Sequence, residues 1–162
     1  MAHSPKLAIL GASGRMGQML IQTIHSGDAA TLVAVADRVG SDWVGRDLGA
    51  CLGAADMGLV VSDDAKATIA AADAVIDFTS PAATVVHAGL AAQSGTAHII
   101  GTTGMTDAEL AAIAGSAQQT AIVRAGNMSL GVNLLTQLTR KVAAALDEDF
   151  DIEVIEYHHN QK

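Results

Sequence analysis

Aromatic residues are scarce in this chain of 162 amino acids. Only four are present, and they are scattered along the sequence: Trp43, Phe78, Phe150 and Tyr157. Modules that bind single-stranded nucleic acid stack bases on aromatic side chains, so this composition argues against that class. The core must be built from small aliphatic side chains, as in α/β proteins whose parallel sheet is covered on both faces.

Clusters of cations and pairs of cysteines are missing as well. The formal net charge is −8 at pH 7, which gives a field that repels phosphate backbones and anionic lipids. Cys51 is the sole cysteine, so an intramolecular disulfide and a thiolate zinc cluster are excluded, and a reduced, cytoplasmic setting is favoured. No apolar run reaches membrane-spanning length. We therefore expect no nucleic acid, membrane or metal among the partners.

What the chain does contain is a regular alternation of strand-like and helix-like segments. Short apolar runs predict strands at 6–10, 31–37, 59–61, 74–78, 97–100, 121–124 and 151–157. Apolar residues at helical spacing predict helices at 15–25, from 62–64 onward, and at 81–93, 107–115 and 129–146. This order predicts right-handed βαβ crossovers and a Rossmann-like, doubly wound parallel sheet. The Gly-rich stretch 38–58 is expected to be a loop.

A glycine-rich turn, GASGRMG at 11–17, separates the first strand from the first helix. Glycines there permit a tight turn, and a pyrophosphate can approach the helix N-terminus. The spacing is GxxGxxG, with Ser13 at the usual second glycine. Asp37 lies 20 residues beyond Gly17, where a carboxylate can accept hydrogen bonds from an adenosine ribose. These features predict a dinucleotide site. Arg38 can stack on adenine or pair with a 2′-phosphate, so NADH and NADPH both remain open.

Two later strands end in loops of small and polar residues, GTTG at 101–104 and AGNMS at 125–129. Ligands of open parallel sheets bind beyond the carboxyl ends of the strands, so both loops suit a binding site. Ordinary turn chemistry is the alternative interpretation for each loop.

The last residues bring together two histidines and a lysine, His158, His159 and Lys162. On a strand, adjacent side chains point to opposite faces, so the two imidazoles could not chelate one metal. A histidine exchanges a proton near neutral pH, and a lysine can bind a carboxylate or supply a proton. The alternative is a polar chain end without a chemical role.

These motifs occur in a fixed order together with two others, DFTSP at 77–81 and EYHHNQK at 156–162. With IIGTTG at 99–104 and AGNMSLGVN at 125–133, they resemble the N-terminal portion of the 4-hydroxy-tetrahydrodipicolinate reductase (dihydrodipicolinate reductase) family over the whole chain. The resemblance implies an oxidoreductase of lysine and diaminopimelate biosynthesis that uses NADH or NADPH. It also implies a dinucleotide-binding domain at 1–128 and, at 129–162, a long helix and strand that begin an α/β catalytic domain.

The resemblance assigns roles to individual residues. His158 would donate the proton, Lys162 would be a second proton donor, and His159 and Thr103 would contact a cyclic dicarboxylate substrate. The residues implied in cofactor binding are Gly11, Ala12, Ser13, Gly14, Arg15, Met16, Asp37, Arg38, Gly101, Thr102, Thr103, Ala125, Gly126, Asn127 and Met128.

Members of the family continue past the lysine into a loop that grips the dicarboxylate, and full-length members are expected to form homotetramers. Two other functions stay open at this point. One is a non-catalytic nucleotide-binding fragment or sensor module, and the other is a different Rossmann dehydrogenase of amino-acid metabolism.

Overall fold

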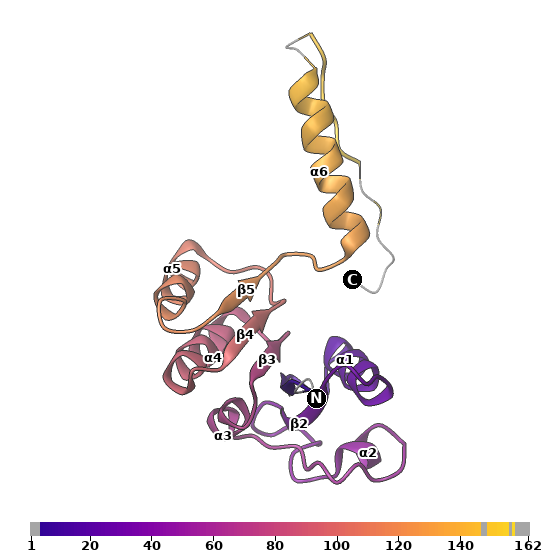
Figure 1. The fold of residues 1–162 in the computed structure, drawn as a ribbon, viewed down its shortest axis with the longest axis vertical. Helices are drawn as coiled ribbons and strands as arrows, with labels where there is room; N and C mark the ends of the chain where they lie inside the picture. Colours follow the sequence, from indigo (N-terminus) through magenta and orange to yellow (C-terminus); the bar gives the residue numbers. More distant parts are fainter. Residues whose placement is uncertain (1–3, 147–148, 156, 158–162) are drawn as a thin grey trace. The chain divides into compact units, whose positions relative to one another are not determined.

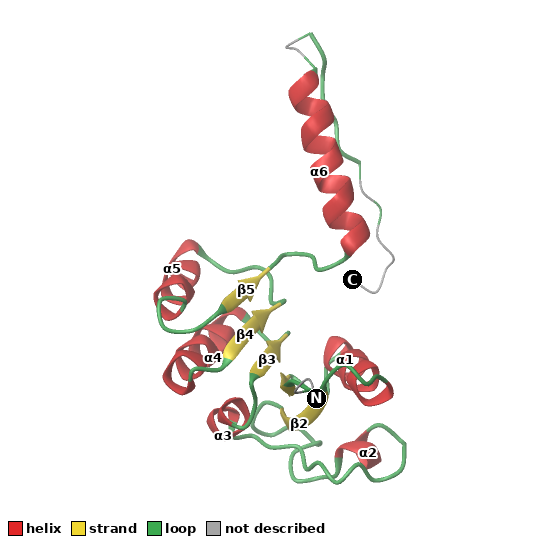
Figure 2. Ribbon diagram, in the orientation of Figure 1, coloured by secondary structure: helices red, strands yellow, loops and turns green. Residues whose placement is uncertain are grey.

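A five-stranded parallel sheet organises the first part of the chain, drawn as yellow arrows in Figure 2. The computed structural model describes residues 4–146, 149–155 and 157. By its internal contacts the chain divides into two units, Met1–Gly126 and Asn127–Lys162, and the sheet belongs to the first. Each unit is considered by itself below.

Outside the segment 38–61, the elements of the first unit follow the order predicted from the sequence (Figure 1). The strands are β1 (Lys6–Leu10), β2 (Thr31–Ala36), β3 (Ala74–Asp77), β4 (Ala97–Ile100) and β5 (Ile122–Arg124). The helices are α1 (Arg15–Ser26), α2 (Leu48–Cys51), α3 (Ala65–Ala70), α4 (Pro81–Ser94) and α5 (Asp107–Ser116). The bounds of β1 and β4 coincide with the predicted ones, and those of β2, β3, β5, α1, α4 and α5 differ by one residue at one end.

The strand order is β2-β1-β3-β4-β5, and every pair is parallel. After β2 the chain passes over β1 and continues on its other side with β3, so the winding direction reverses between β1 and β3. This confirms the Rossmann-like, doubly wound sheet. Such a reversal opens a crevice at the carboxyl ends of the two strands, and that is where ligands of this architecture bind.

The core lies on both faces of the sheet, because successive residues of β1 point to opposite sides. Ile9 packs with Ile21 of α1 and Val35 of β2 on one face. Ala8 and Leu10 pack on the other face in a cluster that includes Ile69, Val75 and Ala91. The buried apolar side chains are aliphatic, as the shortage of aromatic residues requires.

The stretch 38–58 was predicted to be a loop because it is Gly-rich, but it contains the short helix α2. Asp47 stabilises this segment, because its carboxylate accepts hydrogen bonds from the amides of Gly49, Ala50, Met57 and Gly58. The bond from Met57, followed by those from the other three amides, lowers the pKa of Asp47. The strand predicted at 59–61 is wrong. Only isolated bridges form there, Asp47 to Val60 and Ala36 to Ser62.

The second unit contains α6 (Leu130–Ala145), which begins where the sequence predicts the longest helix. Ser129 caps it by accepting a hydrogen bond from the Val132 amide. The strand predicted at 151–157 is wrong for the residues described there, 151–155 and 157, which are not in a strand. An apolar run becomes a strand only where another strand satisfies its backbone groups, and periodicity does not reveal that partner.

The domain boundary predicted between 128 and 129 stays a prediction. None of the helices described in the structure is long and apolar enough to cross a lipid bilayer.

Candidate functional site

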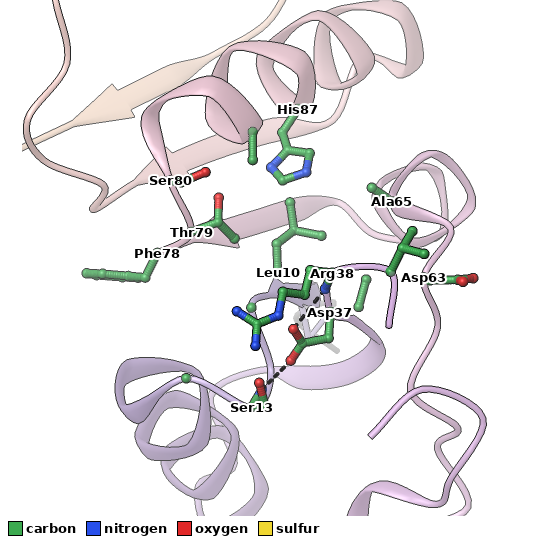
Figure 3. Close-up of a pocket in the computed structure, with 15 residues that line it drawn as sticks. Leu10, Ser13, Asp37, Arg38, Asp63, Ala65, Phe78, Thr79, Ser80 and His87 are labelled. Carbon is green, nitrogen blue, oxygen red and sulfur yellow. Dashed lines mark hydrogen bonds between the residues drawn. The ribbon is translucent and has the colours of Figure 1, made fainter. Parts of the chain in front are cut away.

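A cleft of about 450 Å³ opens at the carboxyl ends of β1, β2 and β3 (Figure 3). We call it the main cleft. It lies at the β1/β3 reversal described above, where a ligand site is expected. It is lined by Leu10, Gly11, Ser13, Gly14, Ala36, Asp37, Arg38, Val39, Asp63, Ala65, Phe78, Thr79, Ser80, Ala83 and His87.

The glycine turn forms one wall of the main cleft. Gly11 has a φ of +79°, in the left-handed region that glycine tolerates best, and its amide donates to the Ala36 carbonyl oxygen at 2.9 Å. Gly17 lies in the first turn of α1. A Cβ there would press on the carbonyl oxygen of Gly11, closer than real Cβ atoms come. Two of the glycines therefore let the turn and the helix start approach each other.

Asp37 and Ser13 are in direct contact where they line the main cleft, as Figure 3 shows. The Ser13 amide donates to Oδ2 of Asp37 at 2.6 Å, and the Arg38 amide donates to Oδ1 at 2.8 Å. A carboxylate has about four lone-pair sites, so Asp37 can hold the glycine turn and still accept hydrogen bonds from a ligand. The predicted ribose-binding carboxylate is thus hydrogen-bonded to the predicted phosphate-binding turn.

A second space of about 300 Å³, the side hollow, adjoins the main cleft. Gly14, Phe78 and Thr79 line both spaces. The other residues that line the side hollow are Arg15, Met16, Gly101, Thr102 and Thr103. The loop after β4 therefore faces the start of α1 across this hollow.

Phe78 and Gly101 depend on each other in the side hollow. A Cβ at Gly101 would run into the ring of Phe78, because the ring occupies the space that a side chain would need. Glycine is therefore required at position 101 by the neighbouring aromatic ring rather than by a left-handed backbone.

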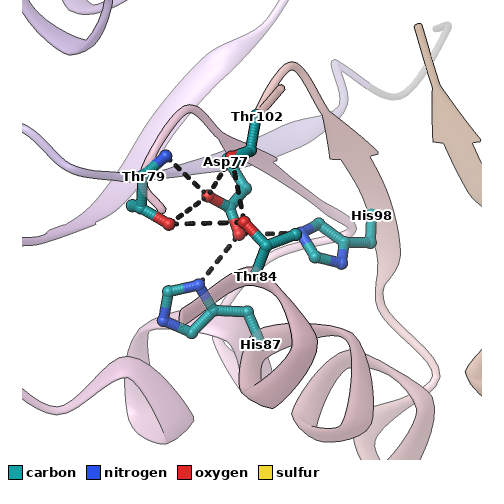
Figure 4. Close-up of polar contacts among 6 residues, drawn as sticks. All are labelled: Asp77, Thr79, Thr84, His87, His98 and Thr102. Carbon is teal, nitrogen blue, oxygen red and sulfur yellow. Dashed lines mark hydrogen bonds and ion pairs between the residues drawn. The ribbon is translucent and has the colours of Figure 1, made fainter. Parts of the chain in front are cut away.

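A buried carboxylate, Asp77, lies at the end of β3 beneath both spaces and is fully buried. Its Oδ1 accepts hydrogen bonds from the Thr79 amide at 2.9 Å and from the Thr79 hydroxyl at 2.6 Å. Its Oδ2 lies 2.8 Å from Nδ1 of His87 and 3.2 Å from Nε2 of His98 (Figure 4). Burial acts to raise the pKa of Asp77, but the bonds from His87, His98 and Thr79 outweigh it and hold the pKa well below its usual range.

Two threonines extend this network toward the GTTG loop. The Thr84 hydroxyl donates to the Thr102 hydroxyl at 2.9 Å, and Thr102 donates to Oδ1 of Asp77 at 3.5 Å. Thr102 is buried, and the residue also lines the side hollow. Asp77 therefore links the loop after β3 to the loop after β4.

The structure gathers most of the predicted cofactor residues around the two spaces. Gly11, Ser13, Asp37 and Arg38 line the main cleft, Gly14 lines both, and Arg15, Met16 and 101–103 line the side hollow. Ala12 is buried behind the turn.

Ala125 and Gly126 follow β5 and do not line either space. Asn127 and Met128 belong to the second unit, where the Asn127 side chain accepts a hydrogen bond from the Ser129 amide. His158, His159 and Lys162 lie outside the described residues. The binding and catalytic roles of all these residues stay predictions.

Sequence reasoning missed the roles of Asp77, His87 and His98, although DFTSP was among the motifs. A signal was present, because Asp77 and His98 alternate with apolar residues and fall on the inward-facing side of their strands. A charged residue at such a position is rare unless it is paired. Across the described residues, no group of three His, Cys, Asp or Glu side chains could hold a metal ion.

Comparison with known families matches almost the whole chain. The sequence model described as "Dihydrodipicolinate reductase, N-terminus" matches residues 5–128, and the one described as "Dihydrodipicolinate reductase, C-terminus" matches residues 131–162.

Several relatives are named 4-hydroxy-tetrahydrodipicolinate reductase. The one from Ruegeria sp. (strain TM1040) is 60% identical over 162 residues, which are 100% of this chain and 60% of the relative. The one from Roseobacter denitrificans is 63% identical over 157 residues, which are 97% of this chain and 58% of the relative. The chain thus spans about 60% of the length of these curated relatives.

Among solved structures, the dipicolinate-bound dihydrodipicolinate reductase from Paenisporosarcina sp. TG-14 superposes with a TM-score of 0.72 at 27% identity. The match covers 88% of this chain and 54% of that one. An amine dehydrogenase from Mycobacterium smegmatis, at a TM-score of 0.63 and 19% identity over 76% of this chain and 39% of its own, shares the fold.

Proposed function

This chain belongs to the dihydrodipicolinate reductase family, and on that premise we propose that it binds NADH or NADPH as the cofactor-binding part of a reductase. The substrate would be 4-hydroxy-tetrahydrodipicolinate, a cyclic dicarboxylate of lysine and diaminopimelate biosynthesis. Family membership by itself implies a nicotinamide cofactor. The choice between NADH and NADPH is left to the experiment below.

The observation that carries the proposal is the pair of joined spaces at the carboxyl edge of the sheet. A nicotinamide dinucleotide consists of two nucleosides joined by a pyrophosphate. The main cleft, with Asp37 and Arg38, suits the adenosine half, and the side hollow, with the GTTG loop, suits the nicotinamide half. The two spaces meet at Gly14, directly before the N-terminus of α1, where backbone amides favour a phosphate.

Each half of the cofactor would have its own ligands in this arrangement. Asp37 would accept hydrogen bonds from the ribose hydroxyls, and Arg38 would stack on adenine or pair with a 2′-phosphate. The backbone of 101–103 would hold the nicotinamide end, assisted by 125–128. When bound, the nicotinamide supplies a hydride, and the protein supplies orientation and protons.

The proton-transfer step is assigned to the end of the chain. We propose that His158 donates the proton, that Lys162 is a second proton donor, and that His159 and Thr103 contact the substrate carboxylates. The Paenisporosarcina relative is described as bound to dipicolinate, a cyclic dicarboxylate, which supports this substrate class. We also propose that the full-length protein acts as a cytoplasmic homotetramer, which light scattering of a longer chain would test.

Calorimetric titration of the chain with NADH and with NADPH tests the cofactor proposal. We expect binding of at least one, and Asp37→Ala should raise Kd about tenfold or more, because hydrogen bonds to a charged acceptor are lost. Asp28→Ala is the matched control, since Asp28 is an exposed carboxylate outside both spaces. A folded chain that binds neither dinucleotide would contradict the proposal.

Turnover separates the reductase from a non-catalytic nucleotide-binding module. Substrate-dependent oxidation of NADH or NADPH by the protein supports the reductase. Binding of the cofactor without such oxidation in a full-length version would favour the module.

A further inference from the structure

His87 occupies two environments at once. Through Nδ1 it contacts the buried Asp77 carboxylate at 2.8 Å, and its ring also lines the main cleft (Figures 3 and 4). Its side chain is 12% exposed. Among the described residues, Nδ1 of His98 is the only side-chain nitrogen or oxygen that is both buried and without a hydrogen-bond partner. Nε2 of His87 is not such an atom, so it is accessible. Nε2 is therefore the atom that His87 offers to a ligand in the main cleft.

The Asp77 carboxylate determines which ring nitrogen of His87 and of His98 carries the hydrogen. An ionised carboxylate only accepts hydrogen bonds, and Asp77 is ionised because its pKa is lowered. Each ring nitrogen that faces it must therefore carry a hydrogen, which places one on Nδ1 of His87 and one on Nε2 of His98. A neutral imidazole has a single N–H, so the opposite nitrogen of each ring is then a bare acceptor.

His98 is the second imidazole whose hydrogen position is set by Asp77. Its Nδ1 has no partner and its side chain is fully buried. Its Nε2 lies 3.2 Å from Oδ2 of Asp77, so His98 completes the set of donors around the carboxylate.

We propose that Asp77 is a positioning residue that holds His87 in the tautomer with its hydrogen on Nδ1, so that Nε2 accepts a hydrogen bond from the bound nucleotide. This rests on the proposed function, since it requires a nucleotide in the main cleft. The partner must be an O–H or N–H donor. Ribose hydroxyls and the adenine amino group qualify, whereas an ionised phosphate oxygen has no hydrogen to give.

The other charged groups at the main cleft are compatible with an acceptor at this position. Asp37, Arg38 and Asp63 also line it, and Asp37 is already engaged with the glycine turn. Asp77 is the charged group in contact with the His87 ring. The main cleft thus presents a carboxylate, a guanidinium and the imidazole of His87 to one nucleoside.

The tautomer is measured directly from the imidazole ¹⁵N chemical shifts of the wild-type chain without nucleotide. These shifts distinguish a protonated ring nitrogen from a bare one, so the result does not depend on a variant that folds. We expect a protonated Nδ1 and a bare Nε2 for His87. A hydrogen on Nε2, alone or on both nitrogens, would overturn the proposal.

The contact with the nucleotide is tested with two amide variants. His87→Asn can still reach Asp77 but not the main cleft, and we expect its Kd for the dinucleotide to rise about fivefold, the usual effect of one lost hydrogen bond. His87→Gln carries its amide as far as Nε2 and should recover part of the affinity. His25→Asn, in the exposed last turn of α1, is the matched control. Equal affinity of wild type and His87→Asn would refute the contact.

An analogue with hypoxanthine in place of adenine identifies the donor, because it lacks the amino group. If the amine is the partner, the analogue binds the wild type more weakly and His87→Asn causes no further loss. If a ribose hydroxyl is the partner, His87→Asn weakens both dinucleotides alike. Failure of the wild type to bind either natural dinucleotide would instead reject the proposed function.

Asp77→Asn tests the positioning role itself. The Thr79 amide donates to the Oδ1 position, and both imidazoles face the Oδ2 position. Because the Thr79 amide can only donate, it favours the asparagine oxygen at Oδ1, and the NH₂ group then faces both rings as a donor. We expect the ¹⁵N signals of His87 to show hydrogen on Nε2 in this variant, with a fold otherwise like that of the wild type. An unchanged His87 tautomer in folded Asp77→Asn would show that another group sets it.

Discussion

Two amphipathic helices of this chain, α1 and α6, have similar sequence patterns and different surroundings. In α1 the Ile21 side chain is completely buried against the sheet, at 0% exposure. In α6 none of the residues is buried, and Leu134, Leu135 and Leu138 are 57%, 65% and 51% exposed. Apolar spacing therefore predicts that a helix forms, and the packing around it decides how much each apolar side chain contributes to stability.

The largest expected difference between the two helices comes from deleting one apolar side chain in each. Ile21→Ala should lower the free energy of unfolding by about 2–5 kcal/mol, because it leaves a cavity in a packed core. Leu135→Ala should change it by less than about 0.5 kcal/mol. Urea unfolding followed by far-UV circular dichroism and by Trp43 fluorescence measures both, since Trp43 packs against the cluster that contains Ile21. Equal losses for the two variants would remove the distinction.

A second pair of variants compares glycines in the two helices. Gly17→Ala should destabilise the protein by about 1–3 kcal/mol, because the new Cβ would press on the Gly11 carbonyl oxygen. It should also weaken dinucleotide binding, since the turn must move. Gly131→Ala in α6 is the matched control, with its nearest contact at 3.9 Å, and should be neutral or stabilising by less than about 1 kcal/mol. Thermal unfolding that ranks these two variants the other way would contradict the packing argument.

The most gradual effect is expected in acid and concerns the buried carboxylate of the first unit. The pKa of Asp77 is lower in the folded protein than in the unfolded chain, so its contribution to stability is present above about pH 4 and is lost as pH falls further. The slope is at most about 1.4 kcal/mol per pH unit for this one group.

Comparison of wild type with Asp77→Asn isolates this contribution, because the other carboxylates titrate in both proteins. The difference in unfolding free energy should be largest near neutral pH and shrink below about pH 4. A difference that stays constant into acid would mean that folding does not lower the pKa of Asp77.

Much of the first unit could be predicted because its signals are local. The strand Lys6–Leu10, the glycine turn and Asp37 follow one another along the sequence, and the spacing alone placed them at one edge of a parallel sheet. Pro81 marked the start of α4 for a similarly local reason, since its missing amide hydrogen is not needed in a first helical turn.

The remainder could not be predicted because it depends on contacts between distant segments. Asp77 comes from β3, His87 from α4 and His98 from β4. Only the folded structure shows that both imidazoles contact the same oxygen of Asp77, Oδ2. The strands predicted at 59–61 and 151–157 had suitable composition, but composition does not supply a neighbouring strand.

The contact between Phe78 and Gly101 has a consequence for protein engineering. Because the phenylalanine ring fills the space beside the glycine, a library that varies position 101 alone should yield few folded variants. Shortening Phe78 first would free that space and enlarge both the main cleft and the side hollow, since the ring borders both. Redesign toward a bulkier cofactor analogue should therefore mutate positions 78 and 101 together, as one unit of selection.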